Sequence, residues 1–73
     1  MEKDELLSII AQAIENKNRV SIKLDSGEEI TGMPAPARSP ELIKVHTFDG
    51  PTWIPIADIE QVVLAPKYPN FIQ

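Results

Sequence analysis

The pair Asp49–Gly50 lies between two segments rich in β-forming residues, within the run LIKVHTFDGPTWIPI at residues 42–56. An Asp-Gly pair in this setting is the strongest short-range signal of a β-hairpin, and no other feature constrains the fold as much. With Asp49 and Gly50 as a two-residue turn, the predicted cross-strand pairs are Phe48 with Pro51, His46 with Trp53, Val45 with Ile54, and Ile43 with Ile56.

Side chains alternate between opposite faces along a strand, so the predicted hairpin has two unlike faces. One face is apolar and is expected to belong to the core; it carries Ile43, Val45, Ile54 and Ile56. The other face combines a cation with aromatic and proline residues, namely Lys44, His46, Phe48, Pro51, Trp53 and Pro55. Such a face is either covered by another part of the chain or binds a partner.

Trp53 decides much about that face. Its bulk can seal a small core, or it can anchor a binding surface, since Trp and Tyr dominate interface energetics. The two interpretations are evenly balanced. Tyr68 and Phe71 of the C-terminal tail make the face structural if they fold over Trp53. If they project instead, they extend a binding surface for another protein or a second copy of the chain. His46, the only histidine, is expected to stack on Trp53 rather than bind a metal.

An amphipathic helix is predicted over Asp4–Asn16, because Leu6, Ile9, Ile10, Ala13 and Ile14 recur at helical spacing. Asp4 is the expected N-cap, and Asn16 or Asn18 is expected to supply the left-handed residue at the end. The helix is expected to pack over a sheet rather than to bind a partner, because so small a core needs the apolar surface that a packed helix buries.

The remaining pattern predicts short strands joined by tight turns. Strands are expected at residues 19–24, 29–33, 42–48, 52–56 and 61–64, with a bend or bulge at Gly32. Pro34–Pro40 is expected to be an irregular loop, since three prolines block sheet hydrogen bonding. The prediction is one mainly-β domain, residues 1–73. It comprises a helix at 4–16, a small five-stranded antiparallel barrel at 19–64 and a tail at 65–73.

Composition narrows the possible functions. The chain has 73 residues, no cysteine, one histidine and a net charge of −4. No nucleophile, glycine-rich phosphate loop or metal-ligand pattern stands out, so we expect no enzyme, no cofactor and no metal. The acidic start and the lack of a long apolar run predict a soluble, cytoplasmic protein. An acidic chain disfavours nucleic acid, for which the cluster Lys17, Arg19 and Lys23 is the alternative surface.

The stretch from Ile10 to Leu64 resembles the Sm-like and SH3-like small barrels. The resemblance rests on a helix followed by V-x-I-x-L-x-x-G-x-x-x-x-G, in RVSIKLDSGEEITG, and on I-P-x-x-D-I, in WIPIADIEQVVL. The same pattern also looks like the YolD-like bacterial and phage proteins and the Rof-like inhibitors of Rho.

RNA-binding Sm proteins carry an Asp and an Asn after the second strand and an Arg-Gly pair before the last. This chain has residues 33–38 (MPAPAR) and 54–58 (IPIAD) at those places. The YolD-like and Rof-like resemblance therefore implies a non-enzymatic regulatory module of bacterial or phage type that binds another protein. The alternative is an Sm-like protein associated with RNA or DNA.

Overall fold

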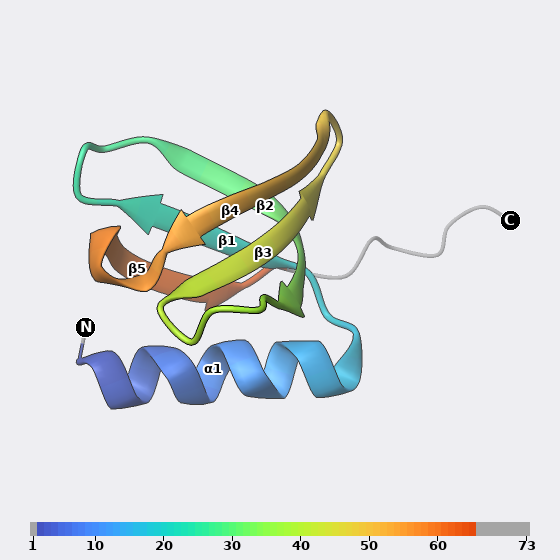
Figure 1. Ribbon diagram of the computed structural model, residues 1–73, viewed down its shortest axis with the longest axis horizontal. Helices are drawn as coiled ribbons and strands as arrows, with labels where there is room; N and C mark the ends of the chain where they lie inside the picture. The colour runs from blue at the N-terminus through green and yellow to red at the C-terminus, as the bar shows by residue number, and fades with distance from the viewer. Residues whose placement is uncertain (1, 66–73) are drawn as a thin grey trace, which may run out of the picture.

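One helix and five antiparallel strands form the part of the chain that the computed structural model describes, residues 2–65 (Figure 1). The elements are α1 (Lys3–Asn16), β1 (Val20–Leu24), β2 (Glu29–Pro36), β3 (Leu42–Thr47), β4 (Gly50–Pro55), the one-turn 3₁₀ helix η1 (Ile56–Asp58) and β5 (Ile59–Leu64). The strands form one sheet in the order β4-β3-β2-β1-β5.

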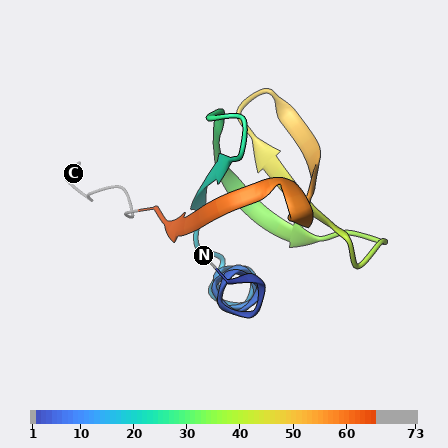
Figure 2. The same cartoon turned by 90° about the vertical axis from the view of Figure 1, so that its left-hand side faces the viewer.

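The sheet curls over α1 without closing (Figure 2). β4 and β5 are its two edges, and within residues 2–65 they do not pair with each other. The predicted mainly-β class, the N-terminal helix and the five antiparallel strands are confirmed. The predicted closure into a barrel is not seen.

The core lies between the concave face of the sheet and α1. Alternation places every second residue of β1 and β3 inward, and the helical stripe faces the sheet. In β5 the two buried residues, Ile59 and Val62, are three apart, because the pairing of β5 with β1 is irregular. The buried apolar residues are Leu6, Ile10, Ala13, Val20, Ile22, Ile43, Val45, Ile54, Ile56, Ile59 and Val62. All four residues of the predicted core face of the hairpin are among them.

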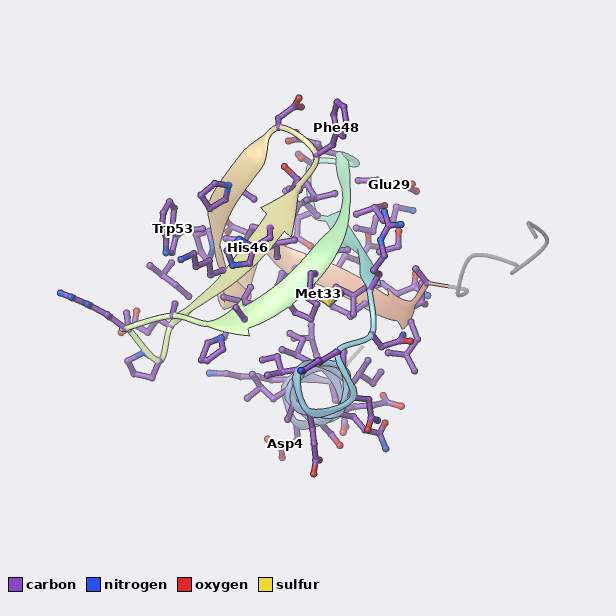
Figure 3. The ribbon with its side chains drawn as sticks, turned by 90° about the vertical axis from the view of Figure 1, so that its right-hand side faces the viewer. Asp4, Glu29, Met33, His46, Phe48 and Trp53 are labelled. Atoms are coloured by element: carbon purple, nitrogen blue, oxygen red, sulfur yellow. The ribbon has the colours of Figure 1, made fainter. Side chains whose placement is uncertain are left out.

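The ends of α1 differ from the prediction. The N-cap is Glu2 without a side-chain cap hydrogen bond, and Asp4 is an exposed first-turn residue that points away from the sheet (Figure 3). At the other end Lys17, not an asparagine, takes the left-handed conformation with φ 52°. The Asn18 N–H donates to the Ala13 carbonyl at 2.8 Å, which satisfies a terminal helix carbonyl.

Strand β2 continues through part of the segment predicted to be irregular. Pro34 pairs with Val45, and Pro36 pairs with Ile43. The pairing of β1 with β2 ends at Gly32, so beyond it β2 has a strand neighbour on the β3 side only. Prolines at alternate positions lack their N–H on the same edge, and a strand tolerates this where that edge is unpaired. The prediction for residues 34–36 was therefore wrong.

The hairpin turn lies one residue earlier than predicted. Thr47 pairs with Gly50, so the two turn residues are Phe48 and Asp49. Gly50 has the only positive φ there, 118°, as in a turn followed by a left-handed glycine. The Thr47 hydroxyl donates to the Gly50 carbonyl at 2.7 Å and accepts from the Asp49 N–H at 3.2 Å.

This change corrects the predicted cross-strand pairs but not the faces. The observed pairs are Ile43 with Ile54, Lys44 with Trp53, Val45 with Thr52, and His46 with Pro51. The register differs from the predicted one by two residues, and an even shift leaves every side chain on its expected side. His46 therefore lies beside Pro51 and not opposite Trp53.

We expect Gly50→Val to destabilise the protein by about 1 kcal/mol or more, because an L side chain is strained at the positive φ of this position. Chemical denaturation of the variant and its parent measures the difference. Asp49→Ala, at a neighbouring turn position with negative φ, serves as the control. A Gly50→Val midpoint equal to that of the parent would place the turn elsewhere.

Candidate functional site

The convex side of β3 and β4 forms an outer hairpin face, made of Leu42, Lys44, His46, Pro51, Trp53 and Pro55. Strand pairing aligns Ala35, Lys44 and Trp53 in one row across β2, β3 and β4. Trp53 remains 53% exposed, and His46 is exposed as well. Figure 3 shows both side chains on the same side of the sheet, away from α1. No described part of the chain covers this face.

Lys44 lies over the exposed indole of Trp53. Its Nζ lies 5.4 Å from the centroid of the Trp53 ring, within the range of a cation–π interaction. Such contacts contribute about 0.5–1 kcal/mol at exposed sites. The two residues are also direct cross-strand partners, so the pairing and the cation–π contact both restrict the orientation of the ring.

A groove of about 300 Å³ lies beside this pair. We call it the Trp53 groove; residues 36–39 form one wall, and Leu42, Lys44 and Trp53 form the other. The continuation of β2 to Pro36 brings the following loop to this position. The loop is held locally, since the Ser39 hydroxyl accepts from the Glu41 N–H at 3.2 Å and the Ser39 carbonyl accepts from the Leu42 N–H at 3.2 Å.

The Trp53 groove is positively charged. Arg38 and Lys44 line it, and no carboxylate of the described residues does. Sequence reasoning found Lys44, His46, Trp53 and Pro55, which do share the outer hairpin face, but missed Arg38. No local pattern predicted its position, because the prolines at 34 and 36 favour a loop and the extension of β2 depends on its pairing with β3.

Phe48 lies apart from the outer hairpin face. It is fully exposed at the tip of the hairpin, and in Figure 3 it lies at the same end of the molecule as Glu29, far from Trp53. Phe48 lines a second cavity, of about 460 Å³, with the acidic residues Glu28, Glu29 and Asp49. Tyr68 and Phe71, the other two aromatic residues predicted for the partner face, lie outside the described residues.

The alternative basic cluster is spread along β1. Lys17 caps α1, Arg19 precedes β1, and Lys23 lies near the far end of that strand. Arg19 and Lys23 are therefore about 13 Å apart along the chain. Lys23 is also the direct cross-strand partner of Glu29, whose charge opposes its own. Lys23 is therefore separated from Arg19 by most of the length of β1.

Other functional chemistry is sparse in the described part of the chain. No polar or charged side chain there is buried, and no group of His, Cys, Asp and Glu residues is arranged to hold a metal ion. None of the helices within residues 2–65 has the length and apolar character needed to cross a bilayer.

Comparison of the chain with models of protein families, with curated proteins and with solved structures finds no match. The outer hairpin face and its groove are therefore interpreted from their own geometry and charge.

Proposed function

We propose that this protein is a non-enzymatic interaction module that binds a partner polypeptide on the outer hairpin face, with Trp53 as the anchor. One observation carries the proposal: the only tryptophan of the chain is half exposed on a strand, while smaller aliphatic residues fill the core. Tryptophan is enriched among the residues that dominate binding energy. A domain this small has little apolar area to spare, so leaving Trp53 outside the core has a cost in stability.

The setting of Trp53 supports a binding role. The ring stands on a β-strand rather than a mobile loop, and Lys44 orients it. Binding to an oriented side chain costs less conformational entropy than binding to a free one. Because the described residues include no buried polar or charged side chain, the structure offers no group in the desolvated setting of a catalytic acid or base.

The fold is consistent with the proposed relation to Sm-like and SH3-like small barrels. A helix precedes five short antiparallel strands, as that resemblance implies. At Gly32 β2 passes from pairing with β1 to pairing with β3, and the sheet as a whole is curled (Figure 2). The YolD-like and Rof-like resemblance supports a regulatory role, exerted through contact with another protein.

Selection from a displayed peptide library tests the proposal without knowledge of the natural partner. We expect the parent protein to enrich a peptide family that Trp53→Ala does not retain. Truncation of such an anchor weakens binding by about 2 kcal/mol, which is roughly thirtyfold. Trp53→Ala should lower the free energy of unfolding by only about 1–2 kcal/mol, less than the about 3–5 kcal/mol typical of a core aromatic.

Phe48→Ala is the matched control, because it removes an exposed aromatic residue outside the outer hairpin face. Peptides enriched by the parent should bind Phe48→Ala unchanged. Two results would contradict the proposal: Trp53→Ala retains the same peptides, or Trp53→Ala is unfolded and shows Trp53 to be structural.

A further inference from the structure

We infer that the Trp53 groove binds an acidic, extended segment of a partner polypeptide. A carboxylate of that segment lies between Arg38 and Lys44, and a neighbouring apolar side chain packs on Trp53. This inference rests on the proposed function and adds the chemistry of the partner.

The charge of the groove is opposite to that of the molecule. The whole chain carries a net charge of −4, yet the charged residues lining the groove are Arg38 and Lys44. The acidic residues Glu28, Glu29 and Asp49 gather instead at the second cavity. A negatively charged segment is therefore attracted to the Trp53 groove and repelled from the acidic cavity. This difference in charge favours an acidic partner and favours its binding at the groove.

The two cations differ in ways that suit one carboxylate. Arg38 is exposed on the loop wall and carries the planar guanidinium that pairs with a carboxylate through two hydrogen bonds. The ammonium of Lys44 lies 5.4 Å from the centroid of the Trp53 ring. Within residues 2–65 neither cation has a carboxylate partner. Both charges are therefore available to a ligand.

The prolines of the edge strand β4 disfavour the addition of a partner strand, so a partner is expected to bind the outer hairpin face instead. Pro51, Trp53 and Pro55 alternate along this edge strand. A proline in an edge strand lacks its N–H on the open side, so of these three residues only Trp53 offers a donor there. Addition of a further strand, from a peptide or from a second copy, would leave carbonyls of the incoming chain unpaired. Recognition by side chains on the outer hairpin face avoids this loss.

A polypeptide fits the groove better than a nucleic acid does. Two cations neutralise only about two phosphates, and the remaining phosphates would meet an acidic molecule. A short acidic peptide concentrates its charge in the groove and supplies the apolar side chain that the Trp53 ring can cover.

Titration of the full chain followed by tryptophan fluorescence tests the inference, because Trp53 is the only tryptophan. The probes are an end-blocked octapeptide of alternating Glu and Leu, the same peptide with Gln for Glu, and an eight-residue oligothymidylate. We expect saturable binding of the acidic peptide. Binding of the Gln peptide should be weaker by about tenfold or more, because charge-assisted hydrogen bonds are lost.

Two variants with the same change in charge locate the site. Arg38→Glu should weaken binding of the acidic peptide by about tenfold or more, since a like charge then faces the carboxylate. Lys23→Glu changes the net charge equally, but Lys23 does not line the groove, and binding should change by no more than about twofold because the long-range effect is screened by salt. Circular dichroism confirms that both variants are folded.

Each other outcome overturns the inference in a distinguishable way. Equal binding of the Gln and Glu peptides would reject the acidic partner and leave the proposed function standing. Failure of the acidic peptide to bind, while the displayed library still yields ligands that need Trp53, would likewise reject the acidic partner and leave the proposed function standing. If the oligothymidylate binds more tightly than the acidic peptide, with a steep dependence on salt, both the acidic partner and the proposed function are rejected, and the outer hairpin face is assigned to nucleic acid.

Discussion

Gly32→Ala is expected to destabilise the protein by about 3 kcal/mol, the upper end of the range for overpacked sites. A Cβ added at Gly32 would lie 2.5 Å from the backbone oxygen of His46 and 2.8 Å from Cγ1 of Val45. The first neighbour is main chain and cannot rotate away. β2 and β3 must therefore separate, at the point where β2 passes from pairing with β1 to pairing with β3.

Urea denaturation of Gly32→Ala and its parent measures this effect. For a chain of this length, a loss of about 3 kcal/mol is a large share of total stability. Thr31→Ala, an exposed neighbour on the same strand, is the control and should change stability by less than about 0.5 kcal/mol. A Gly32→Ala protein as stable as the control would show that the two strands do not approach as closely as described.

Ile10→Asp is expected to abolish cooperative unfolding. Ile10 is 5% exposed and belongs to the core cluster between α1 and the sheet. The substitution removes a large aliphatic side chain, a loss of about 2–5 kcal/mol for truncation alone, and adds an unpaired charge. Because α1 supplies Leu6, Ile10 and Ala13 to one small core, undocking it exposes the sheet.

Thermal unfolding followed by circular dichroism provides the comparison, with Gln12→Asp as the control. Gln12 lies on the same helix and is exposed, so its charge meets water and the transition should stay close to that of the parent. If Ile10→Asp melts like Gln12→Asp, α1 is not part of the core, and a partner-binding helix becomes the better interpretation.

Hydrophobic alternation was enough to predict which side of the hairpin is buried, but not its register. Both the predicted and the observed turns place a glycine at positive φ, so the Asp-Gly pair fits either. The side chain of Thr47 favours the observed one, through its hydrogen bonds to the Asp49 N–H and the Gly50 carbonyl. The faces were predicted correctly because a shift of two residues preserves them.

The Trp53 groove could be predicted only in part. Lys44, His46, Trp53 and Pro55 follow from strand alternation alone, since they belong to one hairpin. Arg38 comes from the next connection in space, and its position depends on how far β2 continues. That length is set by the pairing of residues 33–36 with β3, which is a property of the assembled sheet. Local sequence rules for proline predict a loop at residues 34–36 and not the strand that is observed.

Acrylamide quenching of Trp53 fluorescence in the free, full-length protein tests the central claim most directly. If the outer hairpin face is an open binding surface, the quenching constant of the folded protein will be a large fraction of that of the urea-unfolded protein. It will also be independent of protein concentration. A strongly shielded indole in the folded monomer would contradict the account, because another part of the chain would then occupy the place proposed for a partner.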